Sequence, residues 1–169
     1  MNNSIQLDVI NQSPQNISDI KQSVAKLQYV LEYDRNEIDR LRADLGHILD
    51  VDISKYRCSF LGKLLLKYVS KNNKKLTNLN IELLNSCTNS EYNECIESLN
   101  LYINRLIKSQ QNIANTRYDI RNYILNPSSS MTKSLIIMLF NLLELEYKFV
   151  DTNLDNINIY LLSSQLYNH

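Results

Sequence analysis

The chain has 169 residues and a mass of 19.8 kDa, a length that suits one domain and excludes two domains of ordinary size. Apolar residues make up 44% of the sequence, and the presence of only 2 Gly and 2 Pro argues against disorder, collagen-like repeats and turn-rich β-sandwiches. The 18 basic and 18 acidic side chains cancel, so no overall field draws the whole protein to nucleic acid or to an anionic membrane. We therefore expect a mainly α-helical protein.

Residues 17–49 carry an apolar seam with alternating steps of three and four residues, which predicts one long helix. Asp34 is the one polar residue in the seam, and we expect it to set the register or to face solvent. The seam packs either antiparallel within the protein's own bundle, or against a second copy or another subunit. Its apolar members are Ile17, Ile20, Val24, Leu27, Leu31, Ile38, Leu41, Leu45 and Ile48.

A second amphipathic helix is predicted over residues 52–70. No acidic residue occurs between Asp52 and Glu82, so the basic residues there give this stretch a local positive charge. Such a run is either a solvated helix face or a surface that binds nucleic acid or an acidic partner. The candidate interaction surface consists of Lys55, Arg57, Lys63, Lys67, Lys71, Lys74 and Lys75.

A third helix is predicted from about Asn89 to Leu125. Thr88 and Glu91 have the spacing of a capping box, in which each residue would hydrogen-bond to the backbone N–H of the other. Residues 126–130, with the sequence NPSSS, predict a linker, because Pro127 disfavours helix in the residue before it.

Beyond the linker, apolar residues alternate with charged ones. Leu143, Leu145, Tyr147 and Phe149 have this two-residue period, which predicts a half-buried strand. The pattern favours a small C-terminal β-unit over residues 131–169. An amphipathic helix over residues 132–150 is the alternative that the same residues permit.

Three cysteines, Cys58, Cys87 and Cys95, leave one thiol unpaired in any disulfide scheme, and they lack the CxxC spacing of zinc sites. We expect reduced thiols in a soluble, intracellular protein. The first residues have neither the basic nor the apolar region of a secretory signal, and the longest apolar run is too short to span a bilayer.

Catalytic chemistry has little support in the sequence. His47 is the one histidine away from the terminus, and Gly46 and Gly62 are too few for a glycine-rich phosphate loop. We expect no catalytic residue, no metal and no cofactor, and hence no enzyme.

Four blocks of the sequence, taken in order, are similar to one known family. They are ISDIKQSVAKLQYVLEYDRNE, SKYRCSFLGKLLLKYV, NSEYNECIESLNLYINRL, and TKSLIIMLFNLLELEYKFV followed by INIYLLSSQLY. In the second block Arg57 and Cys58 precede an apolar run, and in the third Glu91, Tyr92 and Tyr102 mark a helix. In this order and spacing the chain resembles subunit one of the GINS complex, the tetrameric helical scaffold of the eukaryotic replicative helicase.

The resemblance implies a non-catalytic nuclear scaffold protein that acts in DNA replication. Its partners would be the sister GINS subunits, the helicase motor ring and replisome proteins, with a possible weak contact to DNA. The implied domains are a helical domain over residues 1–125, a linker over 126–130 and the small β-unit over 131–169. The β-unit would begin at Lys133, Ser134 and Leu135 and end near Ser164, Gln165 and Tyr167.

A second predicted function comes from a different class of protein. The chain would be a compact helical bundle that binds partner helices in a groove, as viral Bcl-2-like proteins do. Neither function involves a small-molecule substrate or a membrane.

Overall fold

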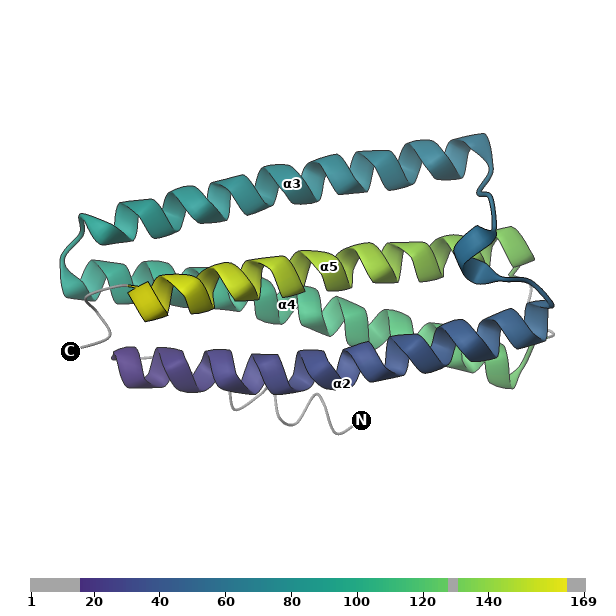
Figure 1. Cartoon of the computed structure of the whole chain (residues 1–169), viewed down its shortest axis with the longest axis horizontal. Coiled ribbons are helices and arrows are strands. Elements are labelled where there is room, and N and C mark those ends of the chain that lie inside the picture. Colours follow the sequence, from purple (N-terminus) through teal and green to yellow (C-terminus); the bar gives the residue numbers. More distant parts are fainter. Residues whose placement is uncertain (1–15, 128–130, 164–169) are drawn as a thin grey trace.

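The computed structural model describes residues 16–127 and 131–163. This part of the chain forms four long α-helices and one short 3₁₀-helix, with no strand, so the predicted mainly α-helical bundle is confirmed (Figure 1). The elements are α2 (Ile17–Leu49), η1 (Ile53–Lys55), α3 (Phe60–Thr88), α4 (Tyr92–Leu125) and α5 (Lys133–Ser163).

Helix α2 has the predicted bounds. The Asn16 side chain caps its first turn by accepting a hydrogen bond from the backbone N–H of Asp19, and Asp50 ends the helix in a left-handed conformation. The apolar seam faces the core as far as Leu45, whereas Ile48 is 37% exposed. Asp34 does not face solvent, because it is fully buried with the seam.

The segment predicted as one helix over residues 52–70 is divided in the structure. Tyr56 has an extended backbone, and α3 starts only at Phe60, where the Ser59 hydroxyl accepts a hydrogen bond from the N–H of Gly62. A serine cap of this kind competes with continuation of the helix from η1. Helix α3 then continues to Thr88, well beyond the predicted end.

The predicted capping box does not form. Thr88 is the last residue of α3, and its hydroxyl hydrogen-bonds to the carbonyl oxygen of Leu84. Glu91 stands at the N-cap of α4 without a side-chain capping hydrogen bond. The body of the third predicted helix is nevertheless confirmed, because α4 ends at Leu125.

The predicted C-terminal β-unit is wrong, because residues 133–163 form the single helix α5. This helix packs against α2, α3 and α4, and a helix with neighbours on several sides is apolar around much of its circumference. Leu143 and Phe149 face the core, whereas Leu145 and Tyr147 are partly buried on another side of the helix. Together these positions produce an alternation that mimics a strand.

The described residues accordingly form one helical bundle and not a helical domain with an appended β-unit. Of the predicted linker, Asn126 and Pro127 follow the end of α4, and residues 128–130 lie outside the described part. The predicted end of the β-unit, with Ser164, Gln165 and Tyr167, also lies outside it.

Helices α4 and α5 form the centre of the bundle. Each packs against the other and against both α2 and α3, whereas α2 and α3 make little direct contact (Figure 1). The core is continuous along this arrangement, with Leu27, Leu41, Leu106, Ile113 and Phe140 all fully buried. Helix α5 lies between α2 and α3, so these two helices are held apart.

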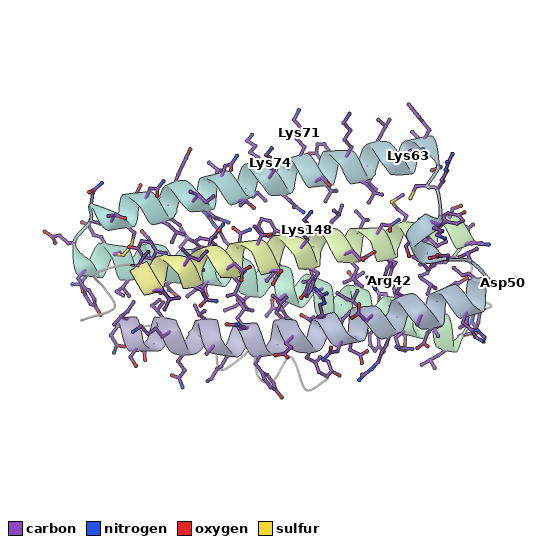
Figure 2. The ribbon with its side chains drawn as sticks, viewed as in Figure 1. Arg42, Asp50, Lys63, Lys71, Lys74 and Lys148 are labelled. Carbon is purple, nitrogen blue, oxygen red and sulfur yellow. A yellow bond between two sulfur atoms is a disulfide. The ribbon has the colours of Figure 1, made fainter. Side chains whose placement is uncertain are left out.

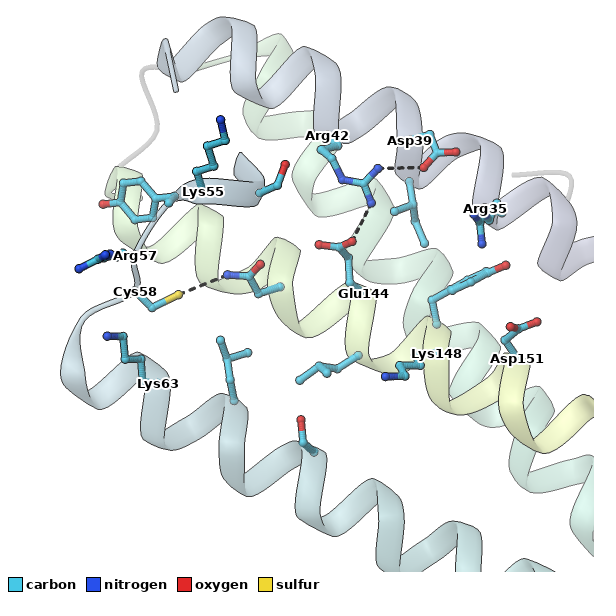
Figure 3. Close-up of a pocket in the computed structure, with 18 residues that line it drawn as sticks. Arg35, Asp39, Arg42, Lys55, Arg57, Cys58, Lys63, Glu144, Lys148 and Asp151 are labelled. Atoms are coloured by element: carbon cyan, nitrogen blue, oxygen red, sulfur yellow. Dashed lines mark hydrogen bonds and ion pairs between the residues drawn. The ribbon is translucent and has the colours of Figure 1, made fainter. Parts of the chain in front are cut away.

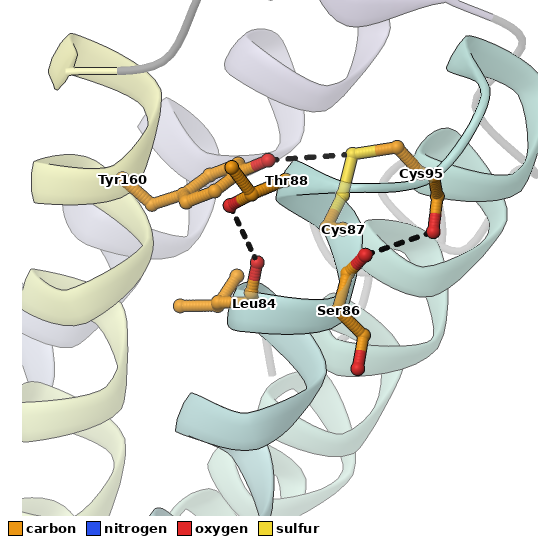
Figure 4. The surroundings of a disulfide bond; sticks show 7 residues. Leu84, Ser86, Cys87, Thr88, Cys95 and Tyr160 are labelled. Atoms are coloured by element: carbon orange, nitrogen blue, oxygen red, sulfur yellow. Dashed lines mark hydrogen bonds between the residues drawn. A yellow bond between two sulfur atoms is a disulfide. The ribbon is translucent and has the colours of Figure 1, made fainter.

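Two of the three cysteines are not free thiols. Cys87 at the end of α3 and Cys95 in the first turns of α4 form a disulfide across the tight connection between the helices (Figure 4). The expectation of three reduced thiols is therefore wrong for this pair. Adjacent helices turn back on each other here and bring the two Cα atoms to 4.7 Å, within the range that a disulfide requires.

We expect the Cys87→Ser/Cys95→Ser variant to lose about 2 kcal/mol in free energy of unfolding, because the bridge closes a loop of only eight residues in the unfolded chain. Urea titration measures the loss. Dithiothreitol should lower the stability of the unaltered protein to the same extent, and Cys58→Ser serves as the matched control. Equal stability of the double variant and the unaltered protein would contradict the cross-link.

Candidate interaction groove

An open groove of about 860 Å³ lies between α2 and α3, with α5 as its floor (Figure 3). Residues three and four apart lie on one face of a helix, so each of the three helices contributes one row of side chains to the groove. The rows are Arg35, Ile38, Asp39 and Arg42 from α2, Lys63, Leu66 and Ser70 from α3, and Asn141, Glu144, Leu145, Tyr147, Lys148 and Asp151 from α5. The segment between α2 and α3 closes one end with Ser54, Lys55, Tyr56, Arg57 and Cys58. The groove therefore arises from the separation of α2 and α3.

Six basic and three acidic side chains line the groove, so it carries an excess of positive charge. Arg42 is held in place, because its guanidinium contacts Glu144 at 2.6 Å and Asp39 at 2.9 Å. Partial burial alone would lower the pKa of Arg42, but the hydrogen bonds to the two carboxylates outweigh it and raise the pKa. With one cation and two carboxylates, this triad forms a fixed part of the wall that carries a net negative charge.

Arg35 hydrogen-bonds to Tyr147, and the other four cations are available to meet a ligand. Arg57, Lys63 and Lys148 form no ion pair with any described residue, and Lys55 contacts only Asp52, at 3.9 Å. Lys148 extends from α5 into the space toward α3, while Arg57 and Lys63 lie at the end near the start of α3 (Figure 3). The positive charge of the groove thus lies toward α3.

A smaller hollow of about 230 Å³ shares Arg35, Tyr147 and Asp151 with the groove and extends it along α2 and α5. Glu32 and Asp155 line this extension. Partial burial raises the pKa of Asp151, and the neighbouring charge of Asp155 raises it further, whereas Arg35 opposes the shift. The combined groove is therefore basic at the end near the start of α3 and acidic in its extension along α2 and α5.

The predicted interaction surface is divided between two places in the structure. Lys55, Arg57 and Lys63 line the groove. The other members are exposed on α3 and do not line it; they are Lys67, Lys71, Lys74 and Lys75.

Sequence reasoning missed the groove residues of α2 and α5. Arg35, Asp39 and Arg42 are spaced at four and three residues, so they share one helix face, and this pattern was available in the sequence. The groove residues of α5 were missed because the two-residue alternation of apolar and charged residues predicted a strand there.

A catalytic or metal site does not emerge in the described part of the chain. His47 is exposed at the end of α2, and the described residues contain no cluster of His, Cys, Asp or Glu that would hold a metal ion. Among the same residues, no helix combines the length and apolar character needed to cross a bilayer. The absence of enzymatic activity and of a cofactor remains a prediction.

Comparison with known proteins gives no match to a family model, a curated protein or a solved structure. The resemblance to subunit one of the GINS complex, with its nuclear location and its partners, therefore stays a prediction.

Proposed function

We propose that this chain is a non-catalytic interaction protein whose groove between α2 and α3 binds an acidic amphipathic helix of a partner protein. The observation that carries the proposal is the convergence of three helix stripes on one open groove with free cations. This is the helix-binding bundle that the sequence offers as its second function.

The charge pattern of the groove supports an acidic occupant with a preferred direction. Arg57 and Lys63 would pair with carboxylates near one end of the bound helix and Lys148 with a carboxylate farther along it (Figure 3). Ile38, Leu66 and Leu145 would contact its apolar side. A helix has partial negative charge at its C-terminus and partial positive charge at its N-terminus. We therefore expect the C-terminus of the partner helix to lie near Arg57 and Lys63 and its N-terminus near Glu32 and Asp155.

Charge reversal in the groove tests this function. An amphipathic peptide of about 18 residues, roughly 27 Å of helix, with glutamates along one flank should bind the unaltered protein. Lys148→Glu should weaken that binding roughly tenfold, because repulsion replaces attraction at an exposed position where solvent screens the charges. Fluorescence anisotropy of the labelled peptide measures the affinity.

The matched control is Lys108→Glu, which makes the same change of charge at an exposed position on α4 outside the groove. A peptide with lysines in place of the glutamates should not bind. Equal losses in the two variants, or equal binding of the two peptides, would refute an acidic helix as the occupant.

Scaffolding in a GINS-like assembly is the second candidate function. The observation that favours it is the large number of apolar side chains that α3 leaves exposed, a surface that a permanent neighbour would cover. The β-unit that a GINS-like subunit would carry is absent from the described residues, so we rank the scaffold function below helix binding.

A further inference from the structure

We propose that the outward face of α3 binds the surface of an anionic lipid bilayer, independently of the groove. In its first turns this helix exposes five large apolar side chains, each between 43% and 76% accessible. They are Phe60, Leu61, Leu64, Leu65 and Tyr68. Monomeric proteins seldom leave such a contiguous apolar patch uncovered.

A basic stripe continues the outward face of α3 beyond the apolar patch. At 100° per residue, Lys67, Lys71 and Lys75 succeed one another at four-residue steps on the side of the helix from which Phe60 and Leu64 project. Every lysine of the stripe is exposed, and α3 has no acidic residue before Glu82. Helices that lie in a membrane interface combine exposed apolar side chains with lysines, whose long side chains reach the headgroups.

The position of α3 leaves this face accessible. The helix forms one edge of the bundle (Figure 1), and Lys71 projects from it to the side away from the other helices (Figure 2). The buried residues of α3 lie on the opposite side of the helix; they are Gly62, Asn80, Leu84 and Cys87. A flat surface could therefore approach the face without meeting the other helices.

The chemistry of the face distinguishes a bilayer from other occupants. A second copy of the chain would bring its lysines against the lysines or the apolar side chains of the first, and neither arrangement gives a lysine an opposite charge. Duplex DNA would satisfy the lysines but leave Phe60, Leu61 and Leu64 in water. An anionic bilayer accommodates both, since each lysine near its surface contributes about 1 kcal/mol and the apolar side chains enter the headgroup boundary. The prediction of no membrane partner rested on the cancelling net charge of the whole chain and on the lack of a spanning segment. Interfacial binding through a local basic and apolar face needs neither a net positive charge nor a spanning segment.

Sedimentation with lipid vesicles tests the proposal. The full chain should bind vesicles that contain about 30 mol% phosphatidylserine and should bind pure phosphatidylcholine vesicles far less. Lys67→Glu/Lys71→Glu/Lys75→Glu should lower the partition coefficient by about 100-fold or more, and added salt should lower that of the unaltered protein. Phe60→Ser/Leu61→Ser should also weaken binding, since it removes apolar contact without changing the charge.

Two controls separate this test from that of the groove. Lys108→Glu should leave vesicle binding nearly unchanged, and the triple variant should keep its α-helical circular dichroism and its affinity for the acidic peptide. Equal binding to both kinds of vesicle, or binding to duplex DNA without binding to vesicles, would overturn the proposal. If the unaltered protein binds anionic vesicles but not the acidic peptide, the result would count against the groove function alone.

Discussion

Replacing Arg117 by leucine is expected to lower the free energy of unfolding by about 3 to 5 kcal/mol at neutral pH, because it leaves the carboxylate of Asp34 buried without a counterion. In the folded protein an Nη1 atom of Arg117 lies 2.7 Å from Asp34, and Gln110 donates a second hydrogen bond to the same carboxylate at 2.9 Å. Asp34 is fully buried, and the side chain of Arg117 is only 9% exposed. Chemical denaturation measures the loss.

The loss should depend on pH with a definite sign. Burial raises the pKa of Asp34 to about 6 from the 3.8 of an exposed carboxyl, although the Gln110 hydrogen bond and the charge of Arg117 oppose the shift. The pKa of Asp34 is higher in the folded protein than in the unfolded chain, so protonation of Asp34 stabilises the folded protein. This stabilisation is fully present below pH 3.8 and is lost as the pH rises through about 6. Without Arg117 the pKa rises further, so the penalty of Arg117→Leu should be large at pH 8 and should shrink toward pH 4.

The control for this prediction removes the charge of both partners. Asp34→Asn/Arg117→Leu should recover most of the lost stability, because the Oε1 atom of Gln110 lacks a partner among the described residues and can accept a hydrogen bond from the new amide. A penalty of Arg117→Leu that is the same at pH 4 and pH 8 would show that lost packing, and not the unpaired carboxylate, is its cause.

Leu41→Ala is expected to cost about 3 to 5 kcal/mol in free energy of unfolding. Leu41 lies in the C-terminal third of α2 with no exposed surface, where packing against the central helices prevents the space from closing. Thermal and urea denaturation of the isolated chain measure the change.

Ile48 provides the matched control within the same helix. It continues the seam but is 37% exposed near the end of α2, so Ile48→Ala should cost much less than Leu41→Ala. Similar losses at the two positions, or no loss at Leu41, would mean that the seam of α2 is not packed as the structure has it.

The sequence predicts best those helices that bury only one face against the core. Helix α2 meets the core on one face, so its apolar residues keep a clean seam, and its two ends were predictable. Asp34 broke that seam, and its partners Gln110 and Arg117 lie 76 and 83 residues away in the chain. A pairing of that kind depends on tertiary packing, which no local pattern reveals.

Helix α5 shows why the remaining part of the fold was missed. Its apolar residues face α2, α3 and α4, so the period of 3.6 is blurred and an apparent period of two emerges. The disulfide was missed for a similar reason: a separation of eight residues allows a bridge only if two helices turn back between Cys87 and Cys95.

The candidate groove was predictable only in part. A charge run identified Lys55, Arg57 and Lys63, which do line it, but the same run also included the lysines of the outward face of α3. Lys55 and Arg57 reach the groove because of the extended turn at Tyr56 and the late start of α3, and Lys63 lines it from the first turn of that helix. Neither feature has a strong signal in the sequence.

The alkylation rate of Cys58 is the measurement that tests the central proposal, the binding of an acidic helix in the groove, most directly. Cys58 is the one free thiol of the chain, it lines the groove, and its Sγ atom lies 3.3 Å from the Nδ2 atom of Asn141 (Figure 3). A saturating concentration of the glutamate-bearing peptide should slow the reaction of Cys58 with iodoacetamide by about tenfold or more, and the lysine-bearing peptide should leave the rate unchanged. An unaltered rate while the acidic peptide is fully bound would place its site elsewhere and contradict the proposal.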